Sequence, residues 1–446
     1  MKLRREVPTP GLISCDTHVH THTYSKHGDA TVDERVITLA GEGIELPIAT
    51  EHDHPADYSG PQKRAGLRPY FTPVSGIEVT TKKGHFNIFP VRPGGTAPDP
   101  RVEDWSQLME SFRATPGVQV VVLNHPRDLH SNFRPFDPVN FNPVTGENLR
   151  GGEFSFDALE VLNSGALQSD FMRLYHDWFA VLNGGQRVTS VGSSDSHDVD
   201  GYIVGQGRTF IAYGRDDEPS SIDINEACRN LLRGRALVSF GLLTRMTIEG
   251  KFGVGDLAVV RGRRMRVTVS MLGPSWVSAD RVELFVKGER IRGREVTAAA
   301  GTVEKAKVTW TLPRPSHDVH LVAIASGPGI TAPYWPMARP SQPTSATWSP
   351  RVIGSTNPVW VDADGDGRYT HPRAYAATLV ERSGADPATL LRGLAPYDQA
   401  VAAQAASLYN AAGHDLRDEK IQRLLRTSPA AVRRGFGLST ATLPRR

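Results

Sequence analysis

The sequence predicts an α/β protein built in three successive parts, and three patterns support this. Up to residue 242, short apolar segments alternate with amphipathic segments of helical period, as in a parallel α/β protein. Between residues 243 and 345, apolar residues recur at every second position, as expected of a β-sandwich whose antiparallel strands have one solvent-exposed face. Residues 346–446 contain an acidic loop followed by segments of helical composition. We therefore expect three domains with these boundaries, because 446 residues are too many for one ordinary core.

The elements of the first part follow in chain order. An apolar pair at residues 12–13 precedes the run 16–20, and Thr31 and Glu34 have the spacing of a capping box at the start of a helix. A strand at 46–50 ends in a polar run, and a helix begins behind an Asp104 cap. Further strands are expected at 74–80, 86–89, 118–123, 158–162, 188–191 and 236–240, and further helices at 105–112, 171–182 and 223–232.

Side chains that bind metals recur where these predicted strands end. His18 and His20 are two apart on an extended chain, so both imidazoles point to one side and can reach one ion. Loops at the carboxyl ends of barrel strands converge on one place, where barrel enzymes have their chemistry. We therefore predict a shared metal site, for which the candidates are His18, His20, Glu51, His52, Glu78, His85, His125, Asp195 and His197.

Other histidines and the cysteines receive structural interpretations. His176 lies on an amphipathic helix, where packing or exposure to solvent is expected. His130 lies in a polar loop at 129–145, which either covers the site or is a plain surface loop. Cys15 is expected to be a small buried residue of the first strand. Neither Cys15 nor Cys228 lies in a metal-binding cysteine pair.

The order of the motifs resembles that of the PHP family (polymerase and histidinol phosphatase). The match covers roughly residues 12–240 and rests on the His18/His20 pair, Thr50-Glu51-His52, Glu78 with His85, His125-Pro126 and Ser194-Asp195-Ser196-His197. Within that family, the runs 24–28 and 40–45 are most similar to the CehA/McbA-type metallohydrolases. The resemblance implies a distorted seven-stranded β/α barrel that holds two or three divalent metal ions, usually zinc, manganese or iron.

The resemblance also implies a role for each candidate ligand. The first metal takes His18, His20 and Asp195, Glu78 bridges the first and second metals, the second adds His85 and His125, and the third takes His52 and His197 with His27 as a helper. Two departures from the family pattern leave alternatives open. Glu51 stands where an aspartate is usual, so it either reaches the metals or does not. The run Ser-Lys-His-Gly is one residue longer than usual, so His27, His22 and Asp29 compete for one position, for which we favour His27.

The expected activity is hydrolysis by direct attack of metal-bound hydroxide on phosphorus or on a carbonyl carbon. Small-molecule phosphate mono- or diesters are the first candidate substrates, and carbamates or carboxylic esters are the second. Arg127 is a candidate for neutralising a phosphate or an oxyanion, and Lys26 and His54 are weaker candidates for contacting the substrate or protonating a leaving group.

Two further classes of protein fit parts of the pattern. A catalytically silent PHP module that binds a partner is one, but silent modules lose ligands and this chain has the full set. An amidohydrolase barrel also opens with His-x-His, but such enzymes often bridge their metals through a modified lysine, whereas Glu78 fills that role here.

An acidic run in the third part resembles the start of a calcium loop. Asp362, Asp364 and Asp366 alternate ahead of a glycine, but the twelfth position is Arg373, so the loop is not an EF-hand. A separate calcium site and a plain acidic turn remain alternatives.

The overall composition narrows the partners and the compartment. Hydrophobic content of 39%, charged content of 22% and a net charge of +3 describe a globular protein and indicate neither a nucleic-acid partner nor a membrane partner. The charged start lacks the apolar segment of a signal peptide, so we expect a cytoplasmic protein or, if the chain has been trimmed, a periplasmic or secreted one. The oligomeric state is left open.

Overall fold

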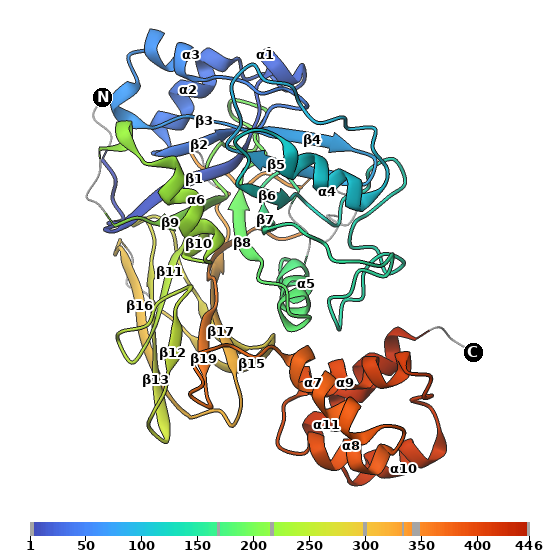
Figure 1. Cartoon of the computed structure of the whole chain (residues 1–446). Coiled ribbons are helices and arrows are strands. Elements are labelled where there is room, and N and C mark those ends of the chain that lie inside the picture. Colours follow the sequence, from blue (N-terminus) through green and yellow to red (C-terminus); the bar gives the residue numbers. More distant parts are fainter. Residues whose placement is uncertain are drawn as a thin grey trace.

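The chain forms a mixed α/β structure, as predicted. A computed structural model describes residues 4–166, 170–214, 218–297, 301–331, 334–340 and 348–443, and these contain three sheets and eleven α-helices (Figure 1). Within the described residues, no helix combines the length and the apolar composition needed to cross a membrane.

A five-stranded sheet in the first half is ordered β4-β5-β6-β7-β8. Its first two pairs are antiparallel and its last two are parallel. The apolar residues of β6 and β7 are fully buried, as expected of parallel strands covered on both faces. The bounds are β4 Ile77–Thr81, β5 Gly84–Phe89, β6 Val120–Leu123, β7 Ala158–Asn163 and β8 Thr189–Ser193.

An eleven-stranded sheet runs from the first half into the second. Its main path is β12-β19-β17-β18-β10-β9-β1-β2-β3, and β14 pairs with β17 and with β15. The strands are β1 Leu12–Val19, β2 Leu46–Ala49, β3 Val74–Ser75, β9 Arg208–Ala212, β10 Ala236–Phe240, β12 Leu257–Val259, β14 Arg281–Val286, β15 Glu289–Glu295, β17 Val319–Pro328, β18 Arg351–Thr356 and β19 Val359–Asp362.

The first half does not form the closed seven-stranded barrel that we expected. Among the described residues, the hydrogen-bonded ladders end between β3 and β4, where the chain passes from one sheet to the other through Gly76. A Cβ atom at Gly76 would lie 2.8 Å from the Ile48 side chain, so the crossing is tight. At the other edge, β8 packs against β1, β9 and β10 without forming a ladder with them, and Val19 at the end of β1 forms an isolated bridge with Ser196, just after β8. The result is two sheets that pack together without a continuous ladder around a barrel.

The period-two pattern of the second half corresponds to real antiparallel strands. A three-stranded sheet, β11-β13-β16, has its apolar side chains on the buried face, and β11 packs against β17 and β18 of the large sheet. Its strands are β11 Leu243–Ile248, β13 Arg264–Leu272 and β16 Glu304–Pro313. Because β18 pairs with both β10 and β17, the predicted boundaries cut through one continuous sheet. Residue 345 lies outside the described residues, and the three-domain division stays a prediction.

Two helices of the first half begin where their caps predict. Thr31 and Glu34 make both bonds of the capping box on α2, and the Asp104 side chain accepts from the backbone of α4. These helices are α1 His22–Ser25, α2 Val32–Gly41, α3 Ser59–Arg64, α4 Trp105–Ala114, α5 Met172–Asn183 and α6 Ile224–Leu232, with short 3-10 turns at Arg68–Tyr70 and Pro219–Ser221.

The end of the chain is mostly helical, as predicted. Five helices gather beyond the strands of the second half. They lie at the end of the molecule opposite to the helices α1, α2 and α3 (Figure 1). They have their own apolar core, which includes Leu390, Val401 and Phe436. Their bounds are α7 Pro372–Ser383, α8 Pro387–Leu394, α9 Gln399–Ala411, α10 Glu419–Thr427 and α11 Ala430–Thr442.

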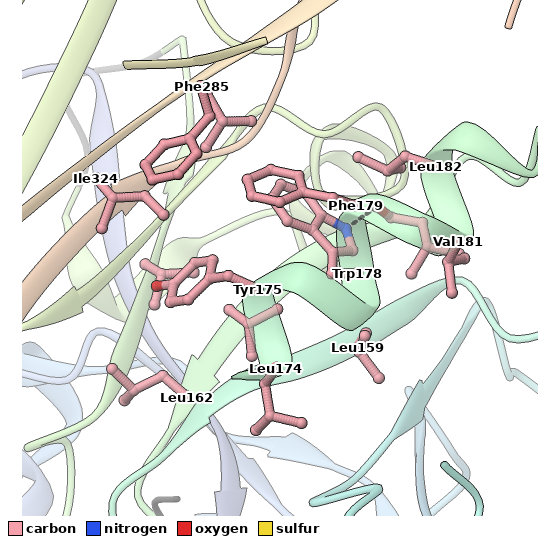
Figure 2. Close-up of a cluster of buried hydrophobic side chains, with 14 of the residues drawn as sticks. Leu159, Leu162, Leu174, Tyr175, Trp178, Phe179, Val181, Leu182, Phe285 and Ile324 are labelled. Atoms are coloured by element: carbon pink, nitrogen blue, oxygen red, sulfur yellow. Dashed lines mark hydrogen bonds between the residues drawn. The ribbon is translucent and has the colours of Figure 1, made fainter. Parts of the chain in front are cut away.

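Helix α5 joins the two halves through its buried aromatic face. Tyr175, Trp178 and Phe179 project between β7 and the strands of the second half, where Phe179 stacks on Phe285 with ring centroids 5.6 Å apart (Figure 2). The Trp178 indole donates to the Val188 carbonyl at 2.8 Å, so its polar atom is satisfied inside the core. The core is therefore shared by the two halves.

Candidate metal centre

The strand ends of the first half bring nine of the ten predicted metal ligands together. Four overlapping groups have ligand atoms that all lie within 4.8 Å of one another, close enough to hold metal ions. They are His18 with His20 and Asp195, His18 with Glu78 and His125, His20 with His52 and His197, and His85 with His125 and His130. His27 is not in these groups but contacts the third one. Glu51 is the predicted ligand that lies elsewhere.

The ligand atoms around His18 and His20 have the spacing of atoms that share one ion. His18 Nε2 lies 3.2 Å from Glu78 Oε1 and 3.3 Å from Asp195 Oδ1, and His20 Nε2 lies 3.3 Å from the same Asp195 oxygen. Two ligand atoms each about 2.1 Å from a tetrahedral ion are roughly 3.4 Å apart. Charge-assisted hydrogen bonds are shorter, at about 2.7–2.9 Å. The residues therefore fit a metal ion.

The orientations of the histidine rings also fit a bound metal ion. His18 Nδ1 contacts Glu160 at 2.7 Å, and His197 Nδ1 contacts the backbone carbonyl of Asp195 at 2.9 Å. A histidine that donates from one ring nitrogen keeps a lone pair on the other, as metal-binding histidines do. The Nε2 atoms of His18, His20 and His197 are buried and have no hydrogen-bond partner among the described residues. Such orphaned atoms are costly unless something else, such as a cation, binds them.

Glu78 is the centre of the cluster, because it belongs to the second group and also contacts His85 of the fourth group. Its Oε1 atom lies 3.2 Å from His85 Nδ1 and 3.5 Å from His125 Nε2, as well as near His18. Strand β4 places Glu78 and strand β5 places His85, and the two strands are neighbours in the sheet. The carboxylate can therefore reach two ions, which is the bridging position expected for it.

Of the three candidates for the extra ligand position, only His27 faces the cluster. Its Nε2 lies 2.7 Å from His52 Nε2, and its ring stacks on that of His197 at 4.1 Å. His22 contacts the carbonyl of Gly28 instead, and Asp29 accepts from the backbone of Val199. The loop approaches His197 closely, because Gly28 has φ +75° and a Cβ there would lie 2.7 Å from the His197 Cβ.

Glu51, whose contact with the metals the sequence leaves open, is occupied by other partners in the structure. Its two oxygens accept four hydrogen bonds, from the backbone and hydroxyl of Thr21, from Ser25 and from Tyr58, at 2.6 to 3.0 Å. The Ser25 hydroxyl in turn lies 3.1 Å from His20 Nδ1. Glu51 therefore holds Ser25, and Ser25 orients the ring of His20, so the carboxylate supports a ligand without facing the cluster.

The three predicted catalytic residues are not free at the cluster. Arg127 makes two hydrogen bonds to Asp177 of α5, at 2.6 and 2.8 Å, and both side chains are buried. Lys26 is exposed and donates to the carbonyl of Thr23, and His54 is exposed and stacks on Tyr24. The Arg127 guanidinium is thus already paired with Asp177, and its role in neutralising a substrate stays a prediction.

The electrostatics of the cluster favour a bound cation. Burial favours the neutral acid at Glu78, but His18 and His85 hold its pKa well below the usual value. Burial also opposes a charge on His18, yet Asp195 and Glu160 raise its pKa well above the usual value. The carboxylates are thus ionised and draw positive charge to the site. A divalent ion would displace that proton and supply the charge.

Two residues of the site were not predicted as parts of it. Glu160 accepts from the His125 backbone at 2.9 Å and from Asn163 at 3.0 Å, in addition to contacting His18. His130 is the third member of the fourth group, with His85 and His125. An ionisable residue inside the apolar run of β7 was the signal for Glu160, but the sequence contains none for the position of His130.

The acidic loop of the third part also forms a group that could hold an ion. Oxygens of Asp362 and Asp364 lie within 4.8 Å of an oxygen of Asp318, the residue just before β17. Asp366, predicted as the third ligand, is not in this group and accepts from the backbone of Arg368. Both oxygens of Asp362 accept from backbone amides of its own turn, so calcium binding here stays a prediction.

These observations describe a protein with a candidate multinuclear metal centre at the strand ends of an α/β fold. The sequence matches no protein-family model and no curated protein.

Proposed function

We propose that this protein is a multinuclear metal-dependent hydrolase of small-molecule phosphate mono- or diesters, related to the CehA/McbA-type branch of the PHP family. The two sheets of the first half would then be an opened version of the PHP barrel. The observation that carries the proposal is the set of buried, unpartnered Nε2 atoms of His18, His20 and His197 around Glu78 and Asp195.

The chain's own residues suit this role in three ways. Glu160, Ser25 and the Asp195 carbonyl fix the ring nitrogens that face the centre. Glu78 and Asp195 supply the negative charge that retains cations. Imidazole and carboxylate donors suit two or three ions such as zinc, manganese or iron. Such ions, when bound, activate water and neutralise the oxygens of the group under attack.

Hydrolysis of carbamates or carboxylic esters is the second candidate, and one observation favours it. Arg127 follows the predicted ligand His125 by two residues, and Asp177 occupies its guanidinium. A phosphate dianion would thus lack the bidentate contact that Arg127 was expected to make with it. A silent binding module remains the third candidate, and the retained ligand geometry argues against it.

The test combines metal analysis with a panel of substrates. The purified protein should contain more than one zinc, manganese or iron ion per chain. With zinc and manganese supplied in parallel, it should hydrolyse p-nitrophenyl phosphate or bis-p-nitrophenyl phosphate faster than p-nitrophenyl acetate or an aryl carbamate. Turnover of the carbon esters alone would replace the phosphoesterase with the second candidate, and absence of bound metal would favour the silent module.

A ligand variant and a matched control connect the activity to the cluster. His20→Ala should lower turnover by more than about 100-fold, beyond the usual effect of an outer-shell change. His176→Ala removes an exposed histidine of α5 outside the cluster and should leave turnover unchanged. Equal activity of the two variants would mean that the site is elsewhere.

A further inference from the structure

His130 lies against His85 and His125, two of the residues assigned to the second metal, although the motif series contains no such residue. Its ring centroid is 5.1 Å from that of His125 and 4.0 Å from that of His85, and His85 and His125 are 5.2 Å apart. Two imidazoles on one tetrahedral ion have centroids roughly 5 Å apart, because each ring begins about 2.1 Å from the ion. The ligand atoms of all three rings lie within 4.8 Å of one another.

The free nitrogen of His130 has nothing else to bind. Its Nε2 is buried and lacks a hydrogen-bond partner among the described residues. A neutral imidazole carries a lone pair on one ring nitrogen, and it binds a metal through that nitrogen.

A tight hairpin holds His130 in place. His130 and Phe133 exchange both backbone hydrogen bonds, at 2.7 and 2.8 Å, around Ser131 and Asn132, which both have left-handed φ values of 47° and 69°. Two successive left-handed residues are the mark of a two-residue hairpin turn. The position of His130 is therefore determined by the backbone and not by a flexible loop.

The hairpin is also attached to the strands that carry the other ligands. The ammonium of Lys83, in the turn between β4 and β5, lies 5.2 Å from the centroid of the Phe133 ring. Pro135 packs over Gly84, where a Cβ atom would lie 2.7 Å from its ring. Glu78 and His85 belong to these two strands, so the hairpin packs against the same strands that carry these two ligands.

We propose that His130 is a fourth protein ligand of the second metal ion, with Glu78, His85 and His125, and that this position selects zinc. The inference rests on the proposed function, since it assumes that the cluster holds metal. Three imidazoles and one carboxylate fit the tetrahedral geometry and the nitrogen preference of zinc, whereas manganese and magnesium favour oxygen-rich sites.

The experiment measures zinc content and does not depend on turnover. The full-length protein, His130→Phe, His130→Cys and His176→Phe are loaded with zinc, dialysed against a zinc-buffering chelator and analysed by elemental mass spectrometry. Phenylalanine keeps a ring against His85 but has no ligand atom, and cysteine supplies a different zinc ligand. His176→Phe makes the same change at an exposed position of α5.

The expected result is that His130→Phe retains one zinc ion fewer than the wild type, while His130→Cys and His176→Phe retain the full number. Wild-type zinc content in His130→Phe would overturn the inference, because the ring would then serve only in packing. Equal loss in His130→Phe and His130→Cys would overturn it too, since the ligand atom would not be the cause. If the wild-type protein retained no zinc, manganese or iron, the proposed function itself would be contradicted.

Discussion

Replacing Glu160 with glutamine should weaken metal binding even though Glu160 is not a ligand. One oxygen contacts His18 Nδ1 at 2.7 Å and also accepts from Ser193, and the other accepts from the His125 backbone and from Asn163. A glutamine has one acceptor oxygen in place of two and no charge, so it cannot serve both pairs of donors.

The magnitude follows from how many ligands Glu160 supports. Loss of an outer-shell partner of a metal-binding histidine costs about 10–100-fold in affinity, or about 1.4–2.7 kcal/mol. Glu160 acts on His18 directly, on His125 through its backbone, and on Asp195 through Asn163, which donates to Asp195 at 3.1 Å. We therefore expect the upper end of that range, about 100-fold.

A competition titration with a chromophoric zinc chelator measures this effect. Glu45→Gln is the matched control, since Glu45 is a buried carboxylate that contacts Ser14 and Arg5 but no residue of the cluster. Near-ultraviolet circular dichroism checks that both variants are folded. Wild-type zinc affinity in folded Glu160→Gln would refute the view that this carboxylate orients the ligands.

Three further outcomes are expected. Arg127→Ala should lower the free energy of unfolding in denaturant by about 3–5 kcal/mol, because Asp177 is left buried and unpaired; unchanged stability with lost turnover would return Arg127 to the substrate. Burial opposes ionisation of Asp398, but Lys287 and His317 hold its pKa well below the usual value, so its stabilisation is present above the unfolded pKa of about 4 and is lost as the pH falls toward the folded value. Asp398→Asn should thus lower the melting temperature near neutral pH and flatten its decline below about pH 4, whereas parallel curves for variant and wild type would contradict this. Chelation should lower the melting temperature in scanning calorimetry, and zinc should restore it; equal melting temperatures with and without metal would count against a cation in the cluster.

Local features of the fold were predictable because their causes are local. The capping box of Thr31 and Glu34 and the Asp104 cap each depend on residues three apart. The buried face of α5 follows from helical spacing of Leu174, Tyr175 and Trp178. The gathering of His18, His125 and Asp195 was predictable from topology, since parallel strands place their carboxyl ends at one edge. Glu78 and His85 reach the same place from an antiparallel pair, which this rule does not cover.

The missed features depend either on contacts between distant segments or on an unusual local backbone conformation. The Arg127 guanidinium meets Asp177, fifty residues along the chain, and no local pattern connects them. Four hydrogen bonds from three residues hold Glu51 away from the cluster, and a sequence motif cannot show which donors surround a carboxylate. His130 depends on two left-handed residues, Ser131 and Asn132, that have no strong signal outside the fold.

The break in the barrel and the metal centre occur at the same place, and this gives the centre a structural role. His18 lies on β1 of the large sheet, His20 directly follows that strand and His52 follows β2 after Thr50 and Glu51, whereas Glu78 and His85 lie on the small sheet. Near the cluster, isolated bridges and single backbone hydrogen bonds, such as those from Asp53 to Glu78 and from Asp195 to His18, join the two sheets in place of a ladder. An ion bound by residues of both sheets would add a further link at this junction. Because binding to the folded state alone stabilises it, the same residues would couple catalytic competence to the integrity of the fold.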